Sequence, residues 1–231
     1  MKKTFFITAT DTDAGKTYVS VGLLKAAHRA GHRSLGLKPI AAGAELINGA
    51  LRNDDALLIQ AASSVRLAYE QVNPVVFEPA IAPHIASAKE NKLITVSRLE
   101  GYLKGSLLTP YDFAIVEGAG GWRVPLNDRE LISDLAKNLG FPIILVVNMK
   151  LGCLNHAVLT AEAIVRDGLK LGGWVANGGQ DTMPYYEENL HSLTNMLSAP
   201  LLGTLTWHNT PSEADVEFDH IFRSFSYAAK G

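Results

Sequence analysis

Short apolar runs alternate along this chain with segments of helical periodicity, and this alternation restricts the possible folds more than any other feature. The predicted strands are 4–8, 35–40, 114–116, 142–147 and 172–177, and the predicted helices are 16–30, 133–139, 156–166 and 185–197. Strands that alternate with helices form βαβ units, which build a parallel sheet with helices on both faces. We therefore predict a single α/β domain over residues 1–231, with long loops at 43–53 and 73–84 and a closing helix after Trp207.

The composition is that of a globular protein without a bias toward a charged partner. Of the 231 residues, 47% are hydrophobic and 19% are charged, and the formal net charge is −2. This balance gives no reason to expect nucleic acid or an anionic membrane as a partner. No run approaches the roughly 20 apolar residues of a membrane-spanning helix, and the lysine-led start is too short for a secretory signal. With Cys153 as the one cysteine, we expect a reducing, cytoplasmic environment.

The segment that joins the first strand to the first helix has the composition of a phosphate-binding loop. It reads Ala-Thr-Asp-Thr-Asp-Ala-Gly-Lys-Thr over residues 9–17. In this context backbone N–H groups and the positive helix terminus bind phosphate oxygens, while Lys16 adds charge and the Thr17 hydroxyl can bind Mg²⁺. Gly15 lets the backbone approach the phosphates closely. Thr10 stands where the general pattern has glycine, so an ordinary strand–turn–helix is the alternative, but the context favours a P-loop fold that binds ATP.

Two further segments supply carboxylates that suit a metal–nucleotide site. Glu117 ends an apolar strand and precedes Gly-Ala-Gly-Gly, and ligands bind at the carboxyl ends of strands in open α/β sheets. Asn53, Asp54 and Asp55 begin another predicted helix. Mg²⁺ takes one or two carboxylates together with phosphate oxygens and water, so Thr17, Asp55 and Glu117 form a candidate set. The alternatives are a strand end with a glycine turn at Glu117 and a helix N-cap at the Asn-Asp-Asp segment.

Six motifs occur in an order that resembles one family in particular. They are Thr10-Asp11-Thr12 with Gly15-Lys16-Thr17, Lys38-Pro39 with Gly43, and the segments 51–56, 116–122, 150–156 and 173–177. Each motif alone is modest, but six in order are specific. From residue 4 to about residue 208 the chain resembles dethiobiotin synthetase. The resemblance implies an ATP-dependent ligase of biotin biosynthesis, working as a homodimer on 7,8-diaminononanoate and CO₂ with Mg²⁺ and ATP.

The resemblance also implies a reaction and the residues that carry it. An amine takes up CO₂ to give a carbamate, which attacks the γ-phosphate of ATP to give a carbamic–phosphoric anhydride. The second amine then closes the cyclic urea with loss of phosphate. Lys16 and Lys38 would neutralise the phosphate and the carbamate, and Thr12 would hydrogen-bond the reacting end.

Further implied residues fall into three groups. Thr17, Asp55 and Glu117 would hold Mg²⁺. The nucleotide would contact residues from the phosphate loop, the glycine loop, a strand end and the last segments, namely Asp13, Ala14, Gly15, Lys16, Thr17, Tyr18, Gly118, Ala119, Gly120, Asn177, Thr206, Trp207, His208 and Glu213. The substrate would contact Lys38, Ala42, Gly121, Cys153, Leu154 and Asn155, of which the last three would begin a helix of the neighbouring subunit. The alternatives are a solvated strand end for Lys38, a small buried thiol for Cys153 and a strand terminus for Asn177.

The chain departs from the family pattern at Ala9, Asp13 and Ala42, where glycine, glutamate and serine are usual. The missing hydroxyl at Ala42 bears on substrate affinity and not on nucleotide chemistry. A septum- or partition-type ATPase switch is the nearest rival class, but it would carry a second lysine five residues before the P-loop lysine, where this chain has Asp11. A related synthetase acting on another substrate is the second alternative.

Overall fold

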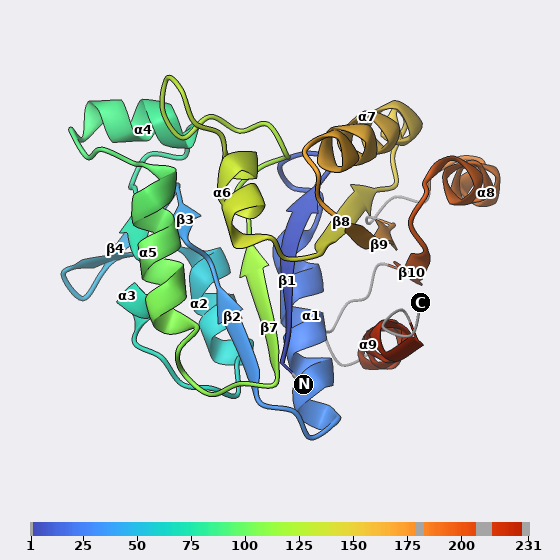
Figure 1. Cartoon of the computed structure of the whole chain (residues 1–231), viewed down its shortest axis with the longest axis horizontal. Coiled ribbons are helices and arrows are strands. Elements are labelled where there is room, and N and C mark those ends of the chain that lie inside the picture. The colour runs from blue at the N-terminus through green and yellow to red at the C-terminus, as the bar shows by residue number, and fades with distance from the viewer. Residues whose placement is uncertain (1, 179–182, 207–213, 228–231) are drawn as a thin grey trace.

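A parallel sheet forms the centre of the molecule. The computed structural model describes residues 2–178, 183–206 and 214–227, and within these ranges six strands lie in the order β10-β9-β8-β1-β7-β2. All neighbouring pairs run parallel, which confirms the predicted parallel sheet (Figure 1). The strands are β1 (Lys3–Ala9), β2 (Ser34–Leu37), β7 (Phe113–Glu117), β8 (Ile143–Asn148), β9 (Leu171–Asn177) and β10 (Leu201–Leu205).

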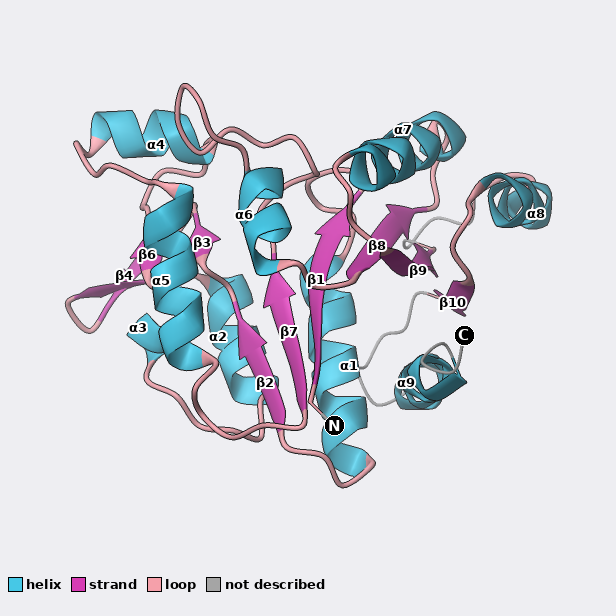
Figure 2. Ribbon diagram, in the orientation of Figure 1, coloured by secondary structure: helices cyan, strands magenta, loops and turns pink. Residues whose placement is uncertain are grey.

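Helices cover both faces of the sheet (Figure 2). One face carries α1 (Lys16–Arg29), α2 (Asp54–Ala62) and α9 (Asp215–Tyr227), which share one buried apolar cluster with the strands. The other carries α5 (Val96–Ser106), α6 (Ile132–Leu139), α7 (Cys153–Arg166) and α8 (Tyr186–Met196), which share a second cluster. Short helices form at α3 (Tyr69–Val72) and α4 (Pro83–Lys89). Among the described residues, no helix combines the length and apolar character that crossing a membrane requires.

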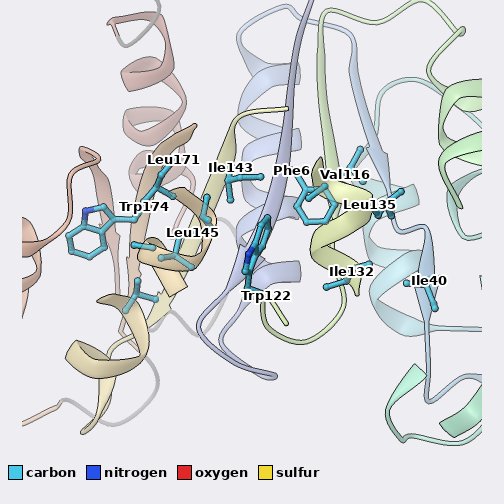
Figure 3. Packing of buried hydrophobic residues seen from close by; sticks show 14 of the residues in the cluster. Phe6, Ile40, Val116, Trp122, Ile132, Leu135, Ile143, Leu145, Leu171 and Trp174 are labelled. Carbon is cyan, nitrogen blue, oxygen red and sulfur yellow. The ribbon is translucent and has the colours of Figure 1, made fainter. Parts of the chain in front are cut away.

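The alternation of side chains along β1 divides the core between the two faces. Phe6 joins the cluster under α5 to α8, and Ile7 joins the cluster under α1, α2 and α9. Both side chains are fully buried, as expected for a central strand of a parallel sheet with helices on both sides. Figure 3 shows Phe6 beside Val116 and Leu135, and the Trp122 ring meets the Phe6 ring edge-on at 6.4 Å between centroids.

The second predicted strand is shorter than expected. β2 ends at Leu37, and after Lys38 and Pro39 the chain forms β3 (Ile40–Ala41), which pairs with β6 (Val75–Val76) in a separate two-stranded sheet. Proline has no backbone N–H to donate to a ladder, so the main-sheet pairing stops before Pro39. Because Leu37 lies opposite Val116, the next residue, Lys38, is brought to the level of Glu117.

The two predicted long loops contain regular structure. The segment 43–53 forms an antiparallel hairpin of β4 (Glu45–Ile47) and β5 (Ala50–Arg52). Its turn residues Asn48 and Gly49 have φ of 51° and 79°, and Asn-Gly is the dipeptide that favours such a tight hairpin turn. The segment 73–84 contains β6 and the beginning of α4. The loop predictions were therefore wrong at these positions, although the hairpin signal is present in the sequence.

Among the elements that were not predicted, α5 and β10 differ in the strength of their sequence signal. α5 carries an ordinary helical signal, because the Thr95 side chain caps it by accepting from Arg98 N, and Val96, Leu99 and Leu103 recur at helical spacing on its buried face. β10 carries a weak signal, since it is a short edge strand whose pairing with β9 shifts register between Leu201 and Gly203.

The last helix packs closely against the first. A Cβ added to Gly22 of α1 would lie 2.3 Å from ring atoms of Phe218, and the same ring meets Tyr18 edge-on at 5.3 Å. At the other end of α1, Arg29 forms ion pairs with Asp215 at 2.8 Å and Asp219 at 2.6 Å. These contacts hold α9 along the helix that begins at the phosphate loop.

We predict that Gly22→Ala lowers the free energy of unfolding by about 1–3 kcal/mol, because the added methyl group overlaps a buried ring that must shift. Urea unfolding measures the change. Gly101→Ala is the matched control, since Gly101 lies within α5 and a Cβ there meets nothing within 4 Å; this change should stabilise by up to about 1 kcal/mol through helix propensity. A Gly22→Ala variant as stable as Gly101→Ala would contradict the close packing of α9 on α1.

Candidate functional site

The candidate site forms where two central strands end side by side. β1 and β7 pair in parallel with Ile7 opposite Glu117. The phosphate loop after β1 and the glycine loop after β7 therefore leave the sheet at the same edge. In open α/β sheets this carboxyl edge is where ligands bind.

The phosphate loop has the backbone that the sequence predicts. Gly15 immediately precedes α1 with φ of +90°, and a Cβ there would lie 2.1 Å from Asn177 Nδ2. Both facts require glycine at this position. Asn177, at the end of β9, donates from Nδ2 to the Ala14 carbonyl at 3.0 Å, so a neighbouring strand supports the loop. Asp13 has φ of +55°, a conformation that a short polar side chain adopts more readily than most.

The Glu117 carboxylate accepts hydrogen bonds from three side chains of the site. It is fully buried and receives hydrogen bonds from the Thr17 hydroxyl to Oε1 at 2.8 Å and from the Ser20 hydroxyl to Oε2 at 2.6 Å. Lys38 Nζ donates to Oε1 at 2.7 Å. A buried carboxylate requires such partners because its desolvation is otherwise very costly. Glu117 therefore does not only end β7, because it also connects α1 and the residue after β2.

Lys38 bridges both candidate metal-binding carboxylates. Its side chain is 5% exposed, and Nζ lies 2.7 Å from Glu117 Oε1 and 3.3 Å from Asp55 Oδ2. Burial by itself lowers the pKa of Lys38, but the Glu117 and Asp55 carboxylates outweigh it and hold the pKa above its ordinary value. Lys38 is thus a paired, charged group and not a solvated strand end.

The structure separates the capping role from the site role in the Asn-Asp-Asp segment. Asn53 caps α2, because its side chain accepts from Ala56 N at 3.2 Å. Asp55, in the first turn of the same helix, directs its carboxylate to Lys38. The helix cap therefore does not need Asp55, which leaves Asp55 available to the site.

Lys16 is buried at the phosphate loop. It is 7% exposed, and Nζ donates to the Asp11 carbonyl at 3.3 Å. Burial, and next the nearby positive charge of Lys38, lower the pKa of Lys16 to about 8. The pKa values of the two lysines shift in opposite directions because Lys38 has carboxylates in contact, whereas Lys16 donates to a backbone carbonyl.

A cleft of about 990 Å³ opens over these groups. Most of the predicted residues of the phosphate loop and the reacting end line it, namely Thr12, Asp13, Gly15, Lys16, Thr17, Tyr18, Lys38, Ala42, Asp55 and Gly120. Residues 80–83, which include the first residue of α4, and residues 123–125 also line it. A cleft of this size is typical of a small-molecule site, and much of its lining is polar or charged.

The glycine loop after β7 packs against the phosphate loop. The Gly118 carbonyl accepts from Lys38 Nζ at 3.3 Å, and Ala119 is partly buried. A Cβ on Gly120 would lie 3.5 Å from Thr12 Oγ1, and one on Gly121 would lie 3.6 Å from the Ala9 carbonyl. The two loops thus form one wall of the cleft.

Other predicted residues lie away from the cleft or outside the described ranges. Cys153, Leu154 and Asn155 form the first turn of α7, where Cys153 is buried, Leu154 is half-buried and Asn155 is exposed. Burial raises the pKa of the Cys153 thiol, in keeping with a small buried side chain. Thr206 is exposed, and its hydroxyl contacts Glu217 Oε1 at 2.9 Å. The predicted residues Trp207, His208 and Glu213 lie outside the described residues.

Ser20 and Arg123 are two polar residues of the site that the sequence analysis missed. Ser20 lies one turn after Thr17 on α1, and this spacing was the available signal. Arg123 lines the cleft and forms an ion pair with Asp167 at 2.7 Å, while its Nη1 also donates to Ser133 Oγ at 3.0 Å. No motif marks Arg123, because its partners come from α6 and from the residue after α7.

A strand, a Gly-Lys-Thr loop and a helix at the carboxyl edge of a parallel sheet define a P-loop nucleotide-binding protein. Residues 3–214 match a family model described as an AAA domain. The chain is 55% identical over 204 residues to the ATP-dependent dethiobiotin synthetase BioD of Cellvibrio japonicus, covering 88% of this chain and 89% of that protein. It is 47% identical to BioD of Marinobacter nauticus, covering 93% and 92%. The chain belongs to the family of ATP-dependent dethiobiotin synthetases.

Solved structures of septum-site ATPases share the fold. MinD from Pyrococcus horikoshii, complexed with Mg-ADP, has a TM-score of 0.61 at 16% identity and covers 100% of this chain and 98% of its own. MinD from Pyrococcus furiosus has a TM-score of 0.62 at 19% identity, covering 98% and 99%. At this identity the likeness concerns the fold alone.

We predict that Lys38→Met lowers the free energy of unfolding by about 3 kcal/mol, because it leaves the buried Glu117 carboxylate without its cation. Adding Glu117→Gln in the same chain should recover much of the loss, since the buried charge is removed as well. Urea unfolding of both single variants and the double variant measures the coupling. A double variant that loses the sum of the single effects would mean that Lys38 and Glu117 do not interact.

Proposed function

We propose that the chain closes the ureido ring of dethiobiotin from 7,8-diaminononanoate, CO₂ and ATP, through a carbamate and a carbamic–phosphoric anhydride. The observation that carries the mechanism is the pair of buried lysines that line one cleft, Lys16 at the phosphate loop and Lys38 opposite it. A carbamate and a γ-phosphate are both anions, so bringing them into contact requires fixed positive charge that water does not screen.

The roles of the residues follow from their positions. Lys16, whose pKa is lowered to about 8, meets the β- and γ-phosphates, which stabilise its charged form. Lys38 lies at the end of β2 beside Gly118 and meets the carbamate. Thr12, which lines the cleft near Gly120, hydrogen-bonds the reacting end. Positioning and electrostatic stabilisation carry most of the catalysis in phosphoryl transfer.

The oxygen atoms near Lys38 fit a Mg²⁺ ion. Glu117 Oε1 and Asp55 Oδ2 both contact the Lys38 ammonium, so two carboxylates already converge on one positive charge, and the Thr17 hydroxyl lies 2.8 Å from the same Oε1. The described residues contain no group of three His, Cys, Asp or Glu side chains that could hold a metal, and Mg²⁺ bound with a nucleotide does not need one. Thr17, Asp55 and Glu117 would hold the ion, which would neutralise phosphate charge.

Three further assignments complete the proposal: the position of the nucleotide base, the site of the substrate carboxylate and the cellular compartment. The nucleotide base lies toward Asn177 and Thr206, and Tyr18 lines that part of the site. The first turn of α7 binds the distant carboxylate of the substrate across a homodimer, since a helix N-terminus favours an anion. The enzyme works in the cytoplasm, where its small-molecule substrates are present.

Incubation of the purified protein with 7,8-diaminononanoate, bicarbonate and Mg-ATP, followed by mass detection, should yield dethiobiotin and one ADP for each product molecule.

Lys16→Ala should lower turnover on the order of 10²-fold or more, because it removes a positive charge whose contact with the transferred phosphoryl group becomes stronger in the transition state. ATP hydrolysis that proceeds equally with and without the diamine, and without product, would instead favour an ATPase switch.

A substitution at Ala42 tests the proposed contact of the cleft with the diamine substrate. It is half-buried in the cleft wall, and its carbonyl accepts from Asn53 Nδ2 at 3.2 Å, which fixes the backbone there. We predict that Ala42→Ser lowers KM for the diamine by roughly 2- to 13-fold, the equivalent of one net hydrogen bond of about 0.5–1.5 kcal/mol. KM for ATP should change little, because the phosphate loop binds the nucleotide independently. A larger change in KM for ATP than for the diamine would mean that position 42 faces the nucleotide.

A further inference from the structure

We propose that Ser20 is a positioning residue that orients the Glu117 carboxylate and thereby sets the affinity of the site for a divalent metal. The inference rests on the proposed function only for the identity of Glu117 as a metal ligand. Ser20 belongs to none of the motifs that mark the phosphate loop, and its hydroxyl is fully buried within α1.

The geometry shows a division of roles between the two carboxylate oxygens. Oε2 accepts from the Ser20 hydroxyl at 2.6 Å, and Oε1 accepts from Thr17 at 2.8 Å and from Lys38 at 2.7 Å. Thr17 and Lys38 line the cleft, whereas Ser20 does not. Glu117 is itself fully buried, but its Oε1 is held by two residues that line the cleft, whereas its Oε2 is held by a residue of the protein interior. Oε1 is therefore the oxygen on the cleft side, and Oε2 is the anchored oxygen.

The anchor is needed because the terminal torsion of glutamate has no sharp preference of its own. Rotation about the last bond of a glutamate side chain is broad and roughly two-fold, so hydrogen bonds decide the orientation of the carboxylate. Ser20 and Thr17 stand one turn apart on α1 and hold different oxygens, which fixes the carboxylate plane relative to the helix. At 2.6 Å, the Ser20 contact has the length of a strong hydrogen bond to a charged acceptor.

Loss of the hydrogen bond between Ser20 and Glu117 should weaken metal binding and leave nucleotide binding unchanged. Ser20 does not line the cleft, and its buried hydroxyl donates to Glu117 Oε2, so its effect on the site passes through Glu117. Hydrogen-bond partners behind a metal ligand typically contribute 10- to 100-fold in metal affinity. The phosphates are bound by loop amides and Lys16, which do not contact the Ser20 hydroxyl.

The test uses Mn²⁺ as the probe, with its binding to the protein–ADP complex followed by electron paramagnetic resonance and metal-free ADP binding followed by calorimetry. We predict that Ser20→Ala weakens Mn²⁺ binding by about 10-fold and changes metal-free ADP affinity less than about twofold. Ser20→Cys, which nearly preserves the side-chain volume but is a weak donor, should behave like Ser20→Ala. Ser106→Ala is the matched control, because Ser106 is a buried serine on α5 that donates to the Gln71 carbonyl at 2.8 Å, and it should leave both affinities unchanged.

The outcomes separate this inference from the proposed function. If Glu117→Gln binds Mn²⁺ as tightly as the wild-type protein does, Glu117 is not a metal ligand. That result would refute both the proposed metal site and the role of Ser20. If Glu117→Gln weakens Mn²⁺ binding but Ser20→Ala and Ser20→Cys do not, the proposed function stands and the role of Ser20 is refuted. Equal losses of Mn²⁺ and metal-free ADP affinity in both Ser20 variants would show a general distortion of the loop, and would also refute it.

Discussion

The fully buried carboxylate of Glu117 is the group on which the arrangement of the site depends. It ends β7 and is held by Thr17 and Ser20 from α1 and by Lys38 from the end of β2. A charge in this position is tolerated only with such partners, because removing one of them leaves the other buried without compensation. The requirement ties three separate elements together at the edge of the sheet where the phosphate loop begins.

The same carboxylate gives the two lysines different electrostatic environments. Lys38 touches Glu117 and Asp55 and remains a firmly charged group. Lys16 has no such contact in its hydrogen bonding, which goes to the Asp11 carbonyl, and burial lowers its pKa. Lys38 is therefore a cation held in place by protein carboxylates, whereas Lys16 is a buried cation whose charged form a bound anion would stabilise.

Sequence reasoning predicted the parts of this arrangement that are local along the chain. The alternation of strands and helices, the Gly15-Lys16-Thr17 segment and the strand ending in Glu117 each have a pattern within a short window, and the parallel sheet follows from them. The contacts made by Lys38 and Ser20 with Glu117 span 79 and 97 residues, so no local pattern could predict them. The pairing of β3 with β6 is likewise set by tertiary contacts, although Pro39, which ends the main-sheet pairing of β2, and the Asn48-Gly49 turn were visible in the sequence.

The protonation states of the two lysines provide the most direct test of this account. Nuclear magnetic resonance of the side-chain amines, followed as the pH of the folded, nucleotide-free protein is raised, can titrate Lys16 and Lys38 separately. The account predicts that Lys16 loses its proton near pH 8, where its pKa is about 8, while Lys38 is still charged at pH 10 because the Glu117 and Asp55 carboxylates raise its pKa. A Lys38 that titrates together with Lys16 or below it would contradict the central role of Glu117.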